Sequence, residues 1–145
     1  IKMKISSKFI TLEGIEGSGK STNLQAINKV LKQNHIKSIY TREPGGSLIG
    51  EKLREILLDV EAVLSNEVEL LLMLADRKDH VDKVILPNLK KGLWVISDRY
   101  MDSSLAYQGG GREMDIGEIL SISSSMNLPA PDLTLLFDGK IFTGR

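Results

Sequence analysis

The 145-residue sequence contains no cysteine, only two histidines and few aromatic residues, and its charges cancel. Without cysteine, disulfide bonds and thiolate metal sites are impossible, which fits a cytoplasmic protein. Nineteen basic residues balance nineteen acidic ones, so bulk electrostatics does not favour a nucleic-acid partner. No apolar run approaches the roughly 18–20 residues of a membrane span, and the beginning of the chain lacks the apolar core of a signal peptide. We therefore expect a cytoplasmic protein that binds neither nucleic acid nor membrane.

What remains is the composition of an ordinary globular protein, with 41% hydrophobic and 26% charged residues. A chain of this length can bury roughly 70% of the surface that its unfolded form exposes. We therefore predict a single domain over residues 1–145.

Segments typical of strands alternate with segments typical of helices along the chain. Strands are expected over residues 8–13, 37–41, 93–97 and 131–138. Helices are expected from residue 20, over 48–58, from about 66 to about 91, and from 116 to about 126. This alternation predicts an α/β fold in which helices cover both faces of a parallel sheet.

Apolar spacing also predicts the inward sides of the helices. The residues expected to face inward in the first two helices are Leu24, Ile27, Val30, Leu31, Ile49, Leu53, Ile56 and Leu57. In the long helix, Asn66 is the expected N-cap, with Glu69 three residues later as in a capping box. Pro87 is expected to kink that helix or end it early, and Gly92 to stop it.

The segment GIEGSGKS, residues 14–21, follows the first predicted strand and leads into the first predicted helix. It matches G-x-x-x-x-G-K-[ST], a loop whose backbone N–H groups surround a phosphate at a helix N-terminus. Lys20 is expected to reach the β- and γ-phosphates, Ser21 to bind Mg²⁺, and Thr22 to add a phosphate hydrogen bond. The expected nucleotide-binding residues are Gly14, Ile15, Glu16, Gly17, Ser18, Gly19, Lys20, Ser21 and Thr22.

This motif predicts a P-loop NTPase-like three-layer fold. The competing G-x-G-x-x-G interpretation fails because Thr22 occupies the third glycine position. The motif alone does not distinguish a kinase from a GTPase, a motor or a nucleotide carrier.

One charge interrupts the apolar stripe of the long helix. The stripe consists of Leu70, Met73, Leu74, Arg77, Val81 and Val84. A buried guanidinium needs partners, so Arg77 either forms an ion pair within the protein or presents its planar donors to a ligand. The sequence leaves both interpretations open. His80, one turn further, is expected to face solvent.

Other polar residues follow the predicted strands at the edge where parallel sheets bind ligands. Asp98 and Arg99 come directly after the third strand and suit Mg²⁺ and phosphate, although a structural ion pair explains them equally well. Arg54 lies close to a Pro-Gly-Gly loop, with a surface pair to Glu51 as the alternative. Together these residues predict a phosphate donor that faces a second anionic substrate.

Tyr107 and Gln108 precede three glycines. They suit recognition of a base or ribose, and a purely structural loop explains them equally well.

Five segments of this chain resemble the bacterial type of the thymidylate kinase (dTMP kinase) family. They are FITLEGIEGSGKST, TREPGGSLIGEKLREILLD, ELLLMLADRKDHV, VISDRYMDSSLAYQGGGR and PDLTLLFD. The resemblance implies a nucleoside monophosphate kinase that transfers the γ-phosphoryl group of ATP to dTMP with Mg²⁺, giving dTDP for dTTP synthesis. It also implies a homodimer, for which the long helix is our candidate face. The alternatives are another nucleotide or nucleoside kinase and a P-loop module without acceptor chemistry.

The resemblance also implies roles for individual residues. Lys20, Arg99 and Glu16 would be catalytic, with Glu16 beside the sugar 3′-hydroxyl of the acceptor unless it is merely a solvated loop acid. Arg54 and Arg99 match arginines on the dTMP phosphate, and Arg77 matches one that contacts thymine. The implied substrate-binding residues are Glu16, Arg54, Met73, Arg77, Arg99, Ser104, Tyr107 and Gln108, and the implied metal-binding residues are Ser21 and Asp98.

The chain departs from the family pattern at two positions. Met73 stands where the family commonly stacks a phenylalanine on thymine, and an ordinary core position is the alternative. Gly17 stands where another subgroup carries a catalytic arginine, and members with glycine there supply arginines from a lid after the fourth strand. Only Arg145 follows Asp138, so we expect a lid and C-terminal helices to be missing after about residue 138.

Overall fold

The computed structural model describes residues 6–14, 20–100 and 116–137. At its centre lies a sheet of four parallel strands in the order β2-β3-β1-β4. The strands are β1 (Phe9–Gly14), β2 (Ser38–Arg42), β3 (Trp94–Asp98) and β4 (Leu133–Phe137). The predicted parallel sheet is confirmed, and its strands lie close to the predicted ranges.

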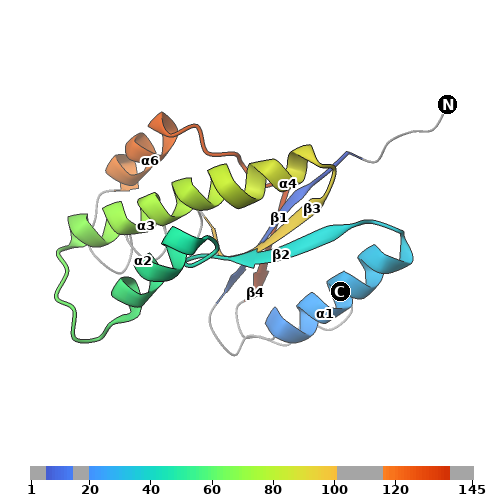
Figure 1. The fold of residues 1–145 in the computed structure, drawn as a ribbon, viewed down its shortest axis with the longest axis horizontal. Coiled ribbons are helices and arrows are strands. Elements are labelled where there is room, and N and C mark those ends of the chain that lie inside the picture. Colours follow the sequence, from blue (N-terminus) through green and yellow to red (C-terminus); the bar gives the residue numbers. More distant parts are fainter. Residues whose placement is uncertain (1–5, 15–19, 101–115, 138–145) are drawn as a thin grey trace.

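Helices cover both faces of the sheet (Figure 1). The helical elements are α1 (Lys20–Gln33), α2 (Leu48–Leu58), α3 (Asn66–His80), the π-helical turn η1 (Val81–Ile85), α4 (Leu86–Lys90) and α6 (Ile116–Ser125). Helix α1 lies on one side, and α3, η1 and α4 form one long helical run on the other, with α2 and α6 beside α3 (Figure 1). We call these two sides the α1 face and the α3 face. Within the described ranges, no helix combines the length and apolar character needed to cross a bilayer.

Two apolar clusters hold the three layers together because successive residues of a strand point to opposite faces. The cluster on the α1 face contains Ile10, Leu12, Leu31 and Ile96. The cluster on the α3 face contains Phe9, Val81, Ile85, Val95 and Tyr100. Neighbouring residues in β1 and β3 therefore belong to different cores.

The α3 face becomes polar towards the carboxyl ends of the strands. On β1 the alternating positions are Phe9, Thr11 and Glu13, and along β2 and just beyond it they are Ile39, Thr41 and Glu43. All the polar members of these two rows are buried. This buried polar end of the sheet is where the candidate site lies.

Three apolar residues that were expected in the core are instead exposed: Val30 at 54%, Ile49 at 49% and Ile56 at 44%. Helix α1 buries Leu31 against the sheet, and Val30 lies one residue, or about 100°, around the helix from it. In α2 the fully buried residue is Gly50, where the helix packs closely against α3. Each helix thus buries a narrower stripe than its apolar spacing indicated.

The start of the long helix also differs from the prediction. Ser65 is the N-cap, and its hydroxyl accepts the Val68 N–H at 3.2 Å, so the assignment of the cap to Asn66 was wrong by one residue. The helix continues past Pro87 to Lys90, after a π-helical turn in which the Leu86 N–H bonds the Val81 carbonyl. The irregularity expected at the proline is therefore a wide turn just before it.

Candidate active site

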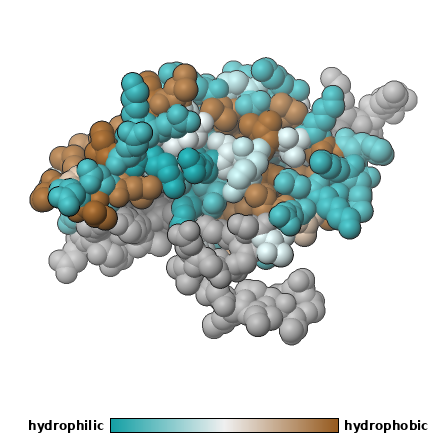
Figure 2. Space-filling model, turned by 60° about the horizontal axis from the view of Figure 1, so that its bottom comes forward, coloured by the Kyte–Doolittle hydropathy of each residue, from teal (hydrophilic) through white to brown (hydrophobic). Residues whose placement is uncertain are grey.

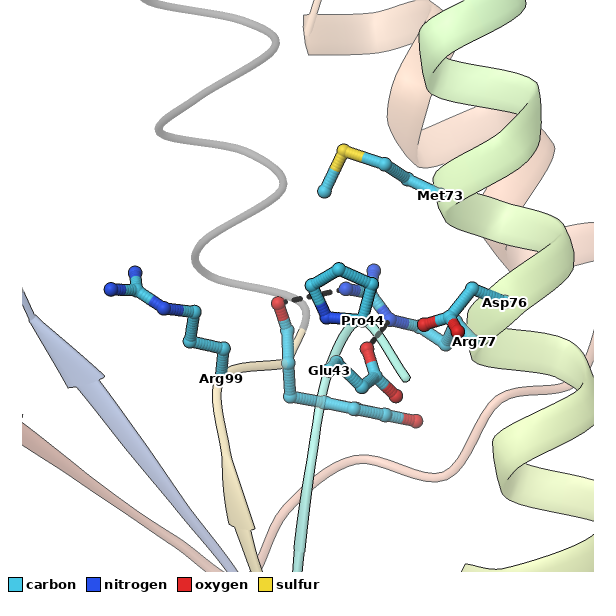
Figure 3. A pocket seen from close by; sticks show the side chains of 7 residues that line it. Glu43, Pro44, Met73, Asp76, Arg77 and Arg99 are labelled. Atoms are coloured by element: carbon cyan, nitrogen blue, oxygen red, sulfur yellow. Dashed lines mark hydrogen bonds and ion pairs between the residues drawn. The ribbon is translucent and has the colours of Figure 1, made fainter. Parts of the chain in front are cut away.

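A pocket opens at the carboxyl ends of β2 and β3, beside α3. It encloses about 280 Å³, including its open mouth. Its lining comprises Glu43, Pro44, Met73, Asp76, Arg77, Arg99 and Tyr100 (Figure 3). Three of these residues, Met73, Arg77 and Arg99, belong to the predicted substrate-binding set. The fold therefore brings together side chains from α3 and from the end of β3 that the sequence had singled out separately.

Arg77 lies at the floor of this pocket and is 2% exposed. Its Nε donates to Glu43 Oε1 at 2.8 Å, and its Nη2 donates to the Tyr100 carbonyl oxygen at 2.9 Å. The guanidinium carbon lies 4.9 Å from the centre of the Tyr100 ring, within cation–π range. Arg77 thus forms an internal ion pair and also lines a cavity, so each interpretation of the sequence describes part of its environment.

The second oxygen of Glu43 contacts His80. Glu43 Oε2 lies 2.7 Å from His80 Nδ1, and His80 Nε2 lies 2.6 Å from Thr41 Oγ1. His80 is fully buried, so the prediction that it faces solvent was wrong. The ring is buried because the segment after β2 folds over it: a Cβ at Gly46 would collide with the imidazole.

Asp76 fastens this segment to α3. Its Oδ1 accepts the Gly45 N–H at 3.0 Å. Burial raises the pKa of Asp76 to about 6, the Gly45 N–H opposes that rise, and the Glu43 carboxylate adds to it. Asp76 therefore binds a proton at a pH where an ordinary aspartate is ionised.

Arg54 supports the same segment from α2. Its Nη1 donates to the Pro44 carbonyl oxygen at 2.8 Å. Gly45 has φ +102°, and a Cβ there would lie 2.9 Å from Arg54 Cδ, so the aliphatic part of Arg54 packs directly on this glycine. Among the described residues, Arg54 is not part of the pocket lining and lies behind one of its walls.

Asp98 and Arg99 occupy the end of β3. Asp98 pairs in register with Leu12 of β1, and the strand alternation places it on the α1 face. Burial raises the pKa of Tyr40, and the charge of Asp98 and its hydrogen bond with Tyr40 raise it further. Arg99 adopts a left-handed backbone with φ 73°, and its N–H donates to the Leu12 carbonyl oxygen at 2.8 Å. Its side chain lies across the pocket from Arg77 (Figure 3).

The phosphate-binding motif is described only at its two ends. Gly14 is the last residue of β1, and Lys20, Ser21 and Thr22 begin α1, so the motif joins a strand to a helix as predicted. The predicted site residues outside the described ranges are Ile15, Glu16, Gly17, Ser18, Gly19, Ser104, Tyr107 and Gln108. Among the residues that are described, no group of three or more acidic, histidine or cysteine side chains is arranged to hold a metal ion.

Comparison with known proteins places this geometry in a family. The family model for thymidylate kinase matches residues 12–143. The chain belongs to the thymidylate kinase family. A thymidylate kinase from Nitrosomonas europaea is 47% identical over 139 residues, which are 95% of this chain and 65% of that protein. Another thymidylate kinase, from Carboxydothermus hydrogenoformans, is 52% identical over 132 residues, which are 90% of this chain and 65% of that protein.

A solved structure agrees with the thymidylate kinase assignment. The crystal structure of the thymidylate kinase from Ehrlichia chaffeensis is similar with a TM-score of 0.80 and 38% identity, covering 92% of this chain and 73% of that one. The predicted P-loop NTPase-like α/β fold is therefore confirmed. The chain spans 65% of the length of the two curated thymidylate kinases above.

Sequence reasoning missed four residues of the pocket: Glu43, Pro44, Asp76 and Tyr100. All four lie inside the segments that carry the thymidylate kinase resemblance, so the segments were noticed while these side chains were given no role. Strand alternation offered a signal for Glu43, because it lies two residues beyond Thr41 and four beyond Ile39 on the same face.

Proposed function

We propose that the protein is a nucleoside monophosphate kinase that transfers the γ-phosphoryl group of ATP to dTMP, giving dTDP and ADP for dTTP synthesis. The observation that carries the proposal is the convergence of Met73, Arg77 and Arg99 on one pocket at the carboxyl ends of β2 and β3. This pocket opens at the same sheet edge as the G-x-x-x-x-G-K-S motif that joins β1 to α1. Family membership supports the proposal.

In this proposal the pocket takes the acceptor. Arg77 offers planar donors to the thymine base, and Met73 covers a face of the ring with a polarizable thioether. Arg99 contacts the acceptor phosphate together with Arg54, whose guanidinium carries five donors and so combines a phosphate contact with its bond to Pro44. Glu16, Ser104, Tyr107 and Gln108 complete the contacts to sugar and base.

The donor ATP binds on the motif, with Lys20 at the β- and γ-phosphates and Thr22 as a further hydrogen-bond donor. Ser21 and Asp98 are proposed to hold Mg²⁺, because Asp98 ends β3 directly beside β1, and a hydroxyl and a carboxylate are hard oxygen ligands. When bound, the ion neutralises phosphate charge.

The residues of the chain then act by positioning. An oxygen of the acceptor phosphate attacks the γ-phosphorus, and the bond to the bridging oxygen breaks, with its electron pair leaving on ADP. Arg99 holds the acceptor phosphate in line while Lys20 offsets charge on the donor. Glu16 accepts a hydrogen bond from the sugar hydroxyl. No strong general base is needed because the nucleophile is already a phosphate oxygen.

We also propose a cytoplasmic homodimer formed through α3 and its neighbour α2. Exposed apolar side chains support this proposal: Ile49 and Ile56 on α2, and Val68 and Leu71 on α3. Figure 2 shows apolar residues gathered at the end of the molecule that contains α2, residues 59–65 and the start of α3. Contiguous exposed apolar surface is typical of interfaces. The proposed use of ATP supports a cytoplasmic location.

The proposed function is tested with the full-length protein, ATP and Mg²⁺. We expect dTMP to be phosphorylated well ahead of AMP, CMP and thymidine, with dTDP identified by chromatography alongside coupled detection of ADP. Equal or faster turnover of another acceptor would overturn the dTMP assignment. Nucleotide-dependent binding of a partner without any phosphorylated product would instead support a P-loop module that lacks acceptor chemistry.

A further inference from the structure

Four side chains form a hydrogen-bonded chain from β2 to the floor of the pocket. Thr41 Oγ1 lies 2.6 Å from His80 Nε2, His80 Nδ1 lies 2.7 Å from Glu43 Oε2, and Arg77 Nε lies 2.8 Å from Glu43 Oε1. All four residues are buried. Because unmade hydrogen bonds are costly in such surroundings, each member restricts the orientation of the next.

The direction of these bonds follows from their chemistry. The Glu43 carboxylate only accepts, so His80 donates from Nδ1. His80 Nε2 then accepts from the Thr41 hydroxyl when the ring is neutral and donates to it when the ring is charged. In either state the imidazole is held at both ends, and rotation of the Glu43 carboxylate would break its bond to His80 or to Arg77.

We propose that Glu43 and His80 are positioning residues for Arg77, and that they set the angle at which its guanidinium meets the base of the acceptor. Glu43 fixes Nε and the Tyr100 carbonyl fixes Nη2, so two of the three guanidinium nitrogens are tied and the plane of the group is defined. A planar donor recognises a base only in a defined orientation. This inference rests on the proposed function, in which Arg77 contacts the base of dTMP.

The segment that carries Glu43 is itself held in place on α3. Asp76, the neighbour of Arg77 on the helix, accepts the Gly45 N–H at 3.0 Å. Arg54 of α2 holds the Pro44 carbonyl at 2.8 Å. A Cβ at Gly46 would collide with the His80 ring and would lie 2.6 Å from the Arg42 carbonyl oxygen. The absence of a side chain at Gly46 thus permits the close approach that lets Glu43 bridge His80 and Arg77.

A pair of substitutions at His80 separates positioning from general stability. The amide nitrogen of asparagine occupies nearly the place of Nδ1, so His80→Asn keeps a donor to Glu43. The amide of glutamine reaches the place of Nε2, so His80→Gln loses that donor and keeps the link to Thr41. In the full-length protein we expect His80→Gln to raise KM for dTMP about tenfold or more and His80→Asn to raise it about twofold, with KM for ATP unchanged in both.

A second pair at Glu43 separates position from charge. Glu43→Gln keeps the length of the side chain. It also keeps the contacts with Arg77 and His80, provided that the ring proton of His80 moves from Nδ1 to Nε2. Glu43→Asp keeps the charge, but its shorter side chain no longer reaches both partners. Positioning predicts a lower KM for dTMP in Glu43→Gln than in Glu43→Asp. Lys78→Ala is the matched control, because it removes only the exposed 3.0 Å pair with Asp82 next to Arg77 on α3 and should change neither KM.

The outcomes separate this inference from the function on which it rests. Absence of dTMP turnover by the wild-type protein would overturn both. Turnover by the wild type with equal dTMP KM values in the two His80 variants would overturn this inference alone, as would a parallel rise in KM for ATP. If the His80 variants do not fold, a lower dTMP KM in Glu43→Asp than in Glu43→Gln would overturn it.

Discussion

The two faces of the central sheet carry different kinds of core, although the same strands build both. The cluster on the α1 face consists of the aliphatic residues Ile10, Leu12, Leu31 and Ile96. The α3 face begins with Phe9 and Val95 and ends with a buried network around Glu43 and Arg77. In β1, the residues that pack in the cluster of the α1 face therefore alternate with residues of the α3 face, which become polar towards the end of the strand. One strand can thus stabilise the fold on one side and shape a ligand site on the other.

The difference is energetic as well as chemical. Burying apolar side chains is favourable almost without geometric conditions, whereas burying a charged pair incurs desolvation that good geometry only offsets. The Glu43–Arg77 pair is therefore weak evidence for stability. We interpret the polar end of the α3 face as shaped by positioning of the acceptor, and the apolar cluster on the α1 face as shaped by packing.

The largest loss of stability is expected when only one member of the Glu43–Arg77 ion pair is removed. Arg77→Met leaves the Glu43 carboxylate buried without its ion-pair partner and should lower the free energy of unfolding by about 3–5 kcal/mol. The double variant Arg77→Met, Glu43→Gln removes both charges and keeps an acceptor for His80, so it should recover most of that loss. Urea unfolding of the wild type, both single variants and the double variant measures the coupling.

Activity should not recover with stability. The double variant is expected to keep a raised KM for dTMP, because the planar donor group is gone. Losses of stability that simply add would show that the two side chains act independently, contrary to the ion pair at 2.8 Å.

A smaller and purely structural effect is expected on the α1 face. Leu12→Ala removes a side chain that is 1% exposed and should lower the free energy of unfolding by about 2–4 kcal/mol through lost burial and a cavity. The folded variant should keep the wild-type KM for dTMP. A rise in that KM as large as the rise for His80→Gln would contradict the division of labour between the faces.

The smallest effect concerns the pH dependence that Asp76 contributes. Its folded pKa of about 6 lies above the ordinary value of 3.8, so the folded protein holds a proton that the unfolded chain has released. This contribution to stability is present at low pH and is lost as pH rises from about 4 to about 6. Asp76→Asn keeps the acceptor for the Gly45 N–H and should abolish this loss, which we expect to be about 1–2 kcal/mol after screening by the open pocket.

Urea unfolding of the wild type and Asp76→Asn across pH 4–7.5 measures this contribution. Asp79, three residues further along α3, is the matched control, because its hydrogen bond from Ser47 lowers its pKa. Asp79→Asn should therefore show the opposite sign: it loses stability relative to the wild type as pH rises towards the ordinary value of 3.8, so this pair of curves is extended below pH 4. Parallel curves for Asp76→Asn and the wild type would refute the elevated pKa.

Much of the fold was predictable because its signals are local. The β-branched and aromatic residues of KFITLE, which predict a buried strand, and the helical spacing from Leu70 to Val84 depend only on near neighbours in the sequence, and both predictions agree with the structure. The width of a buried stripe is not local, since it depends on the partner, and this explains the errors at Val30, Ile49 and Ile56. Ser65 and Asn66 are adjacent and both able to cap a helix, and only the backbone conformation decides which of them is the N-cap.

The site was predictable in part for the same reason. Arg77 stood out as a charge on an apolar stripe, which is a local signal. Its partner Glu43 lies 34 residues away and reaches it only through tertiary packing, and His80 lies 37 residues from Glu43. His80 lies seven residues after Met73 and so belongs to the same stripe, but without its partner Glu43 the sequence offered no reason to bury an imidazole there. The roles of the residues outside the described ranges stay predictions from the family resemblance.

The contact between Gly46 and His80 has a consequence for sequence variation. The imidazole fills the space that a side chain at position 46 would need, so the two positions form one steric unit across 34 residues of chain. Any residue larger than glycine at position 46 would require a smaller residue at position 80, and that change would also release Glu43. Among related sequences we therefore expect positions 43, 46 and 80 to vary together or not at all.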